Sequence, residues 1–179
     1  TPLVAILTTT NIEKCLPTIV SRCVTVKVNP LLFKEVIKGN EDRFSREQAY
    51  ALSLFAPTFK EMETLSRSDD FINAFQVSET FISDLVSSLE KAGFGLLKEG
   101  SGLLKTQNSI KYFATILIKV FSNVLSSNYS DSFSTFAISV KPYKDSLPKT
   151  IDVLADILNT LPANMNTTLS LARIINSLK

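Results

Sequence analysis

The sequence predicts a mainly helical fold that follows a short α/β segment at the amino end. Residues 3–7 are a continuous apolar run, typical of a strand buried in a parallel sheet, and residues 24–28 alternate like a second strand. After Val28 the spacing of apolar residues changes from two to about 3.6 and does not change back, which indicates helices. With 179 residues, 45% of them hydrophobic, the chain can bury a substantial core.

The two predicted strands imply a larger sheet. A strand that is apolar on both faces needs neighbours, so we expect most of this sheet to lie in a longer protein of which the chain is a carboxy-terminal piece. Between the strands, Pro17 suits the first position of a short helix that runs through residues 18–22. Residues 12–15 form the turn before that helix.

Three short helices are predicted over residues 30–68. Asn29 is an N-cap, Pro30 opens the first helix, and Gly39 is its expected stop. Two more helices begin at capping boxes, in which a hydroxyl residue is followed three positions later by Gln or Glu: Ser45 with Gln48, and Thr58 with Glu61. These helices make a compact unit of their own.

The remaining residues, 69–179, are expected to form a helical bundle. A long helix is predicted from Ser68 to about Lys91, ended by Gly93 and Gly95, and a short one follows over residues 96–104. Residues 107–127 carry the broad apolar stripe of a central helix. The last helices cover residues 146–160 and 167–178, the final one capped by Asn166, whereas residues 128–148 show no clear pattern.

The composition excludes several kinds of chemistry. The chain has no histidine, so Ser-His and Cys-His nucleophiles and the usual zinc-activated water sites are excluded within it. Cys15 and Cys23 have the spacing of neither a metal site nor a disulfide framework, and we expect buried thiols. Residues 95–100 resemble a phosphate-binding loop only superficially, because Ser101 and Gly102 replace the required Lys and Ser or Thr.

Charge and hydropathy predict a soluble cytoplasmic protein. The formal net charge of +2 is too small for a self-sufficient nucleic-acid binder. Lys111 and Lys119 interrupt the most hydrophobic stretch, so no run is long enough to span a membrane. The amino end lacks the positive n-region of a secretory signal.

The motif that suggests a function lies in residues 8–23, which read Thr-Thr-Thr-Asn-Ile-Glu-Lys-Cys-Leu-Pro-Thr-Ile-Val-Ser-Arg-Cys. This segment resembles the sensor 1 and Ser-Arg-Cys motifs of clamp-loader subunits, which belong to the AAA+ superfamily. The resemblance covers about the first 29 residues. It implies that residues 1–29 are the carboxy-terminal remnant of an AAA+ core, residues 30–68 a three-helix lid, and residues 69–179 a helical collar that joins the subunits of a ring.

The resemblance implies a role for each residue of the Ser-Arg-Cys motif. Arg22 would be an arginine finger, offered in trans to the γ-phosphate of ATP on a neighbouring subunit. Ser21 would cap or orient the turn, and Cys23 would pack beneath it. From the residues alone, the alternative is that Arg22 is a surface cation paired with a carboxylate of the lid.

Thr10 and Asn11 match the sensor 1 position, where a polar side chain at the end of a strand faces the γ-phosphate or the attacking water. The alternative is that Thr8, Thr9 and Thr10 only close the strand end. The chain itself would bind no cofactor and no metal, because ATP and Mg²⁺ belong to the neighbouring subunits. It would therefore not be an enzyme alone, but part of a DNA polymerase III holoenzyme.

Residues 161–171 resemble the last turn and helix of bacterial delta-prime clamp-loader subunits, although Ala172 and Arg173 stand where many relatives have an acidic residue. The implied partners are the gamma/tau and delta subunits, and the sliding clamp and primer-template DNA through the whole complex. Two alternatives stay open. One is a gamma/tau motor subunit, which shares the Ser-Arg-Cys motif, and the other is an all-helical interaction module without a nucleotide role.

Overall fold

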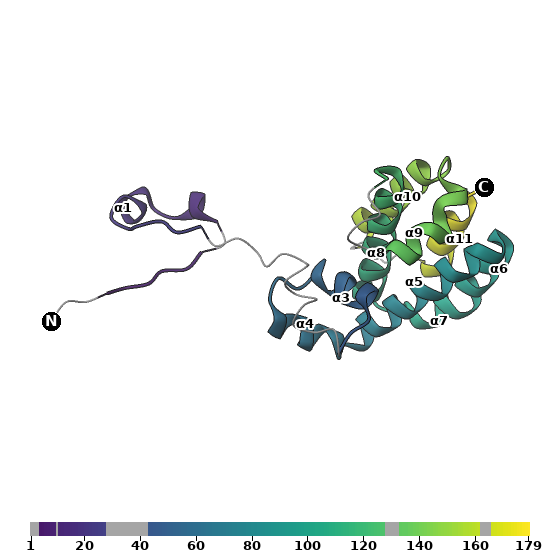
Figure 1. Cartoon of the computed structure of the whole chain (residues 1–179), viewed down its shortest axis with the longest axis horizontal. Coiled ribbons are helices and arrows are strands. Elements are labelled where there is room, and N and C mark those ends of the chain that lie inside the picture. Colours follow the sequence, from purple (N-terminus) through teal and green to yellow (C-terminus); the bar gives the residue numbers. More distant parts are fainter. Residues whose placement is uncertain (1–3, 10, 28–42, 128–132, 162–165) are drawn as a thin grey trace. The chain divides into compact units, whose positions relative to one another are not determined.

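The computed structural model describes residues 4–9, 11–27, 43–127, 133–161 and 166–179 (Figure 1). The chain divides into two compact units, Thr1–Pro30 and Leu31–Lys179. All regular secondary structure in the described residues is helical. The predicted mainly helical class is therefore confirmed.

The first unit contains a 3-10 turn, η1 (Ile12–Lys14), and the short helix α1 (Pro17–Val20). Pro17 opens α1 as predicted, but the helix ends at Val20 instead of Arg22. The two predicted strands are wrong for the described residues of this unit, 4–9 and 24–27, which have no strand structure. The reason is that a strand requires hydrogen-bonded neighbours, and these segments have no ladder partner among the described residues. Their apolar side chains are consequently exposed, with Val24 at 93%.

Helices α3 (Arg46–Ser53) and α4 (Phe59–Ser66) begin where their capping residues predict. The backbone N–H of Gln48 donates to Ser45 Oγ over 3.1 Å. Thr58 and Glu61 form the complete reciprocal box, because each side chain accepts a hydrogen bond from the backbone of the other. The helix predicted to start at Pro30 falls in residues 28–42, outside the described residues.

The predicted long helix is interrupted earlier than expected. Helix α5 (Asp69–Ser87) stops before Ser88, whose backbone is extended at φ −169° and ψ 156°. The Ser88 hydroxyl then accepts a hydrogen bond from the N–H of Lys91 and caps α6 (Leu89–Gly95). The π-helical turn η2 (Leu96–Gly100) and α7 (Ser101–Leu103) follow α6 directly.

Gly93 lies inside α6, so the prediction that it ends a helix is wrong, whereas Gly95 is the last residue of α6 and the π-helical turn η2 follows it directly. Gly93 allows α6 to lie close to α11 (Thr167–Ser177), because glycine has no side chain. A Cβ atom at Gly93 would lie only 3.1 Å from Ile175 Cγ2. The glycine therefore reflects tight packing between helices that are distant in the sequence.

Helix α8 (Gln107–Leu125) is the central helix of the second unit and packs against both α5 and α10 (Leu147–Thr160). Asn166 caps α11 as predicted, with its side chain accepting from the N–H of Leu169. Helix α9 (Ser134–Val140) and the 3-10 turn η3 (Lys141–Tyr143) were not predicted. Helix α9 begins after Phe133, a buried residue in the left-handed conformation.

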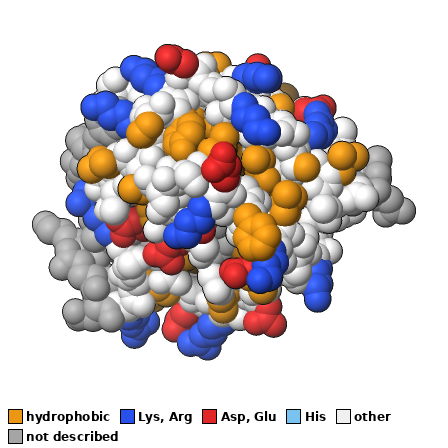
Figure 2. Space-filling model, turned by 90° about the vertical axis from the view of Figure 1, so that its right-hand side faces the viewer, with side chains coloured by type: hydrophobic (Ala, Val, Ile, Leu, Met, Phe, Trp, Pro, Cys, Tyr) orange, Lys and Arg blue, Asp and Glu red, His pale blue; other side chains and the backbone are white. Residues whose placement is uncertain are grey.

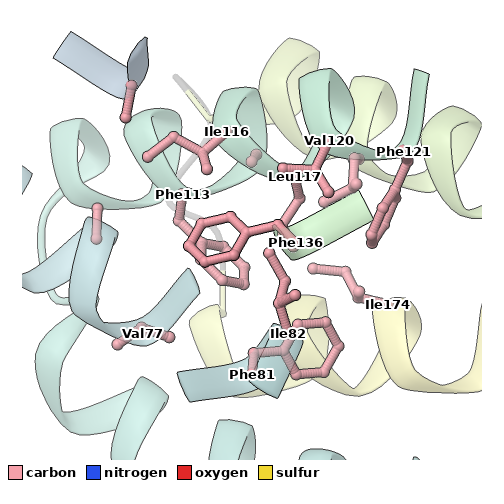
Figure 3. Close-up of a cluster of buried hydrophobic side chains, with 14 of the residues drawn as sticks. Val77, Phe81, Ile82, Phe113, Ile116, Leu117, Val120, Phe121, Phe136 and Ile174 are labelled. Atoms are coloured by element: carbon pink, nitrogen blue, oxygen red, sulfur yellow. The ribbon is translucent and has the colours of Figure 1, made fainter. Parts of the chain in front are cut away.

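One hydrophobic core fills the second unit. Figure 3 shows Phe113, Leu117 and Phe121 of α8 directed toward side chains of α5, α9 and α11. The same core includes Leu52 of α3 and Met62 of α4, which are 0% and 2% exposed. Helices α3 and α4 thus share a core with α5 and α8, while the division into lid and collar stays a prediction.

Gly102 provides a stability prediction, because an added Cβ would meet no atom within 4 Å. Gly102→Ala is expected to stabilise the protein by about 0.5–1 kcal/mol, since alanine restricts the unfolded chain and favours the helix. Chemical denaturation measures the difference. Gly100→Ala is the control, because its Cβ would lie 3.0 Å from Leu96 Cδ1 and 3.3 Å from Val77 Cγ1. An equal gain in both variants would contradict the explanation.

Candidate functional site around Arg22

The turn that carries Arg22 is built by the hydrogen bonds that end α1. The N–H of Ser21 donates to the Pro17 carbonyl over 2.9 Å, and the N–H of Arg22 donates to the Ile19 carbonyl over 3.0 Å. The N–H of Cys23 donates to the Val20 carbonyl over 3.3 Å. The backbone N–H groups of all three motif residues are therefore used within the turn.

The Arg22 side chain is exposed and lies two residues after the last residue of α1. No ion pair joins it to another of the described residues. A guanidinium stays charged at physiological pH and offers a planar set of N–H donors that matches a phosphate or carboxylate. Arg22 is thus available to an anionic group outside the described part of this chain.

Ser21 and Cys23 differ in how they support the turn. The Ser21 hydroxyl donates to the Thr18 carbonyl over 3.3 Å, which closes the end of α1. Cys23 is exposed and Cys15 is only partly buried, so the expected burial of both thiols is wrong. The cause is that the described residues of the first unit contribute nothing to the hydrophobic core.

The predicted sensor residues can be described only in part. Thr10 lies outside the described residues. Asn11 Oδ1 accepts a hydrogen bond from the Glu13 N–H over 2.9 Å and caps η1. The Thr9 hydroxyl accepts from the Asn11 N–H over 3.1 Å and donates to the Asn11 carbonyl over 3.0 Å. The polar groups of Asn11 thus stabilise a local turn, and none of these bonds connects it to Arg22.

The capping role of Asn11 was missed by the sequence analysis. The signal was present, because asparagine is among the preferred N-cap residues and a turn was expected immediately after it. The resemblance implies a contact with the γ-phosphate for Asn11 and no capping role. A polar residue at the start of a turn satisfies backbone N–H groups first, and this requirement is local.

No metal centre is evident in the part of the chain that the structure describes. There, no group of three or more His, Cys, Asp or Glu side chains is placed to hold a metal ion. A depression between α5 and η2 includes Thr80, Asp84 and Glu99 in its lining and has a volume of about 20 Å³. It accommodates roughly one water molecule and is too small for a nucleotide.

The surface shown in Figure 2 mixes hydrophobic, basic and acidic side chains, and no broad area on this face is uniformly basic. This mixture agrees with the small formal net charge of +2. None of the helices in the described ranges combines the length and the apolar character needed to cross a membrane.

Comparison with known protein families, with curated proteins and with solved structures found no match to this chain. The features of the chain that bear on its function are therefore the Ser21–Cys23 turn and the helical unit. The structure adds two properties to the sequence motif: the Arg22 side chain is exposed, and its backbone is held in a hydrogen-bonded turn.

Proposed function

We propose that this chain is part of a bacterial clamp-loader subunit of the delta-prime type, which acts in the cytoplasm. In this role it supplies Arg22 as an arginine finger to an adjacent ATPase subunit and does not itself hydrolyse ATP. The observation that carries the proposal is the exposed Arg22 guanidinium in the Ser21–Arg22–Cys23 turn directly after α1. A side chain that serves another subunit must be accessible from outside its own chain.

The chemistry of the finger follows from the charge that phosphoryl transfer develops. Negative charge spreads over the phosphoryl oxygens in the transition state, and a planar guanidinium can donate two hydrogen bonds to them. The nucleotide and its Mg²⁺ belong to the gamma/tau neighbour in this proposal. The residues of this chain position one cation, and the hydrogen bonds of Ser21 and Cys23 hold the backbone that carries it.

The helical unit supports a second part of the proposal, in which residues 69–179 act as the collar that joins the ring and residues 30–68 as the lid. The helices of this collar, from α5 to α11, pack around one continuous hydrophobic core. Among its exposed residues are large apolar side chains, including Phe94 at 67% and Leu169 at 62%. We propose that these side chains contribute to the contacts between subunits. The sliding clamp and primer-template DNA would then be bound by the assembled complex.

Reconstitution with sister subunits tests this proposal. The protein containing this chain is mixed with gamma/tau and delta from the same source, and the mass of the complex is measured by analytical ultracentrifugation. We expect one stable ring, and we expect Arg22→Ala to assemble equally well, because Arg22 is exposed and outside the core. A mixture in which this protein sediments alone would exclude the clamp-loader proposal. Binding to an unrelated partner would then favour the interaction-module alternative.

A further inference from the structure

The segment that connects α9 to α10, residues 141–149, presents three exposed lysines and is called the basic segment below. Lys141 and Lys144 lie one 3-10 turn apart, because the Lys144 N–H donates to the Lys141 carbonyl over 3.2 Å. Lys149 lies in the first turn of α10. Asp145 is the one acidic residue of the segment, so the segment has a net charge of +2, as large as the formal net charge of the whole chain.

The three lysines have no carboxylate partner among the described residues of the chain. The ion pairs found there involve other cations, namely Arg43 and Arg67 with Glu63, Lys91 with Asp84, and Arg173 with Asp156. Unpaired ammonium groups that are grouped on a surface create a local positive potential, which attracts an anionic partner. The basic segment is therefore a candidate surface for such a partner.

Hydrogen bonds to other helices hold the backbone of the basic segment in place. The Tyr143 hydroxyl donates to the Leu85 carbonyl of α5 over 3.1 Å. At the other end, the Ser177 hydroxyl of α11 donates to Thr150 Oγ1 over 3.0 Å, and both side chains are buried. The backbone that carries the lysines is thus ordered before a partner binds, which lowers the entropic cost of binding.

The other side chains of the basic segment indicate which kind of anion it fits. Leu147 is 0% exposed, and Tyr143 is partly buried, so the segment exposes no large apolar or aromatic anchor. Protein–protein interfaces are centred on such anchors and are depleted of lysine, and single-stranded nucleic acids stack on aromatic rings. Contacts to the backbone of a DNA duplex need neither, because lysines bind the phosphates directly.

We propose that Lys141, Lys144 and Lys149 contact the phosphate backbone of double-stranded DNA without reading its sequence. The small formal net charge of +2 makes this a weak contact that adds to others in an assembly. The inference goes beyond the proposed function, in which the assembled complex binds DNA, because it assigns a DNA-binding surface to this chain. It does not depend on the role proposed for Arg22.

Binding of the whole chain to a fluorescently labelled DNA duplex of mixed sequence tests the proposal. Fluorescence anisotropy is measured at several salt concentrations. Each neutralised phosphate contributes about −0.9 to the slope of log K against log salt, so three lysines should give about −2.7. A fourfold rise in salt should then lower the affinity about 40-fold. A native chain that does not bind the duplex at low salt would overturn the proposal.

The triple variant Lys141→Gln/Lys144→Gln/Lys149→Gln should lose most of the binding and nearly all of the salt dependence. The matched control is Lys60→Gln/Lys105→Gln/Lys111→Gln, which removes the same charge from exposed lysines on α4 and near the start of α8. The control should keep the slope of the native chain. Equal losses in the two variants would mean that the total charge attracts DNA, and the basic segment would have no special role.

Two further measurements do not require the glutamine variants to fold. Replacing the same three lysines by arginine keeps the charge, so binding to the duplex should be retained, and its loss would contradict a phosphate contact. Poly-glutamate should bind the native chain more weakly than the duplex does. Tighter binding of poly-glutamate would indicate an acidic protein as the partner and overturn the proposal, while the expectation for Arg22→Ala would stay unchanged.

Discussion

Arg22→Ala is expected to lower the clamp-stimulated ATP turnover of the neighbouring subunit by about 10³-fold or more, because arginine fingers contribute on the order of 10³–10⁵ in rate. The ring should still assemble, since Arg22 is exposed and forms no ion pair with the other described residues. Steady-state phosphate release from the reconstituted complex measures the effect. The loss should appear in kcat, because the interaction strengthens in the transition state.

Arg22→Lys distinguishes the effect of the positive charge at this position from the effect of the planar guanidinium. Lysine keeps the positive charge but lacks the planar fork that donates two parallel hydrogen bonds to phosphoryl oxygens. Turnover should therefore recover only in part compared with Arg22→Ala. Full recovery with lysine would show that long-range charge alone is sufficient. Normal turnover in Arg22→Ala would exclude a finger at this position and leave Arg22 as a surface cation.

The helix starts could be predicted from the sequence because capping is a local interaction. Thr58 with Glu61, and Asn166 with the N–H of Leu169, involve residues within three positions of one another. The side-chain oxygen satisfies a backbone N–H that has no partner inside the helix, wherever that helix packs. The same reasoning, applied to Asn11, would have found the start of η1.

The errors arose where a distant contact decides the local structure. Gly93 has the signature of a helix end, yet Ile175 of α11 accounts for the glycine, and no local pattern contains that contact. Helix α9 begins after Phe133, whose backbone is left-handed and whose ring packs against the distant ring of Tyr50 and against Phe136. The two predicted strands failed for a related reason, since a strand depends on neighbours that the described residues do not supply.

The residues of the candidate site could be predicted from the sequence, but their exposure to solvent could not. The order Ser21, Arg22, Cys23 after a short helix that starts with Pro17 identified the turn. The exposure of Arg22 and Cys23 could not be derived, because burial depends on what packs over the turn rather than on the turn itself. The role of Asn11 in capping likewise depends on which backbone N–H group its side chain reaches first.

Phe121→Ala is expected to be the most destabilising of the substitutions considered, with a loss of about 3–5 kcal/mol in the free energy of unfolding. Phe121 is 0% exposed and projects from α8 into the core shared with α5, α9 and α11 (Figure 3). Without the Phe121 ring, less apolar surface is buried, and the close-packed neighbours fill the resulting cavity only partly. Small domains are stable by about 5–15 kcal/mol, so this loss would be a large share of the total.

Urea denaturation followed by far-ultraviolet circular dichroism measures that loss, because the helical unit dominates the signal. Phe94→Ala removes the same side chain from a position that is 67% exposed, where the ring contacts the Lys98 ammonium at 5.5 Å. Its cost should stay within about 0.5 kcal/mol, as for other surface substitutions. Both variants replace one Phe by Ala, so the difference between their free energies of unfolding measures the effect of burying the ring. Equal losses would mean that α8 does not hold the centre of a packed core.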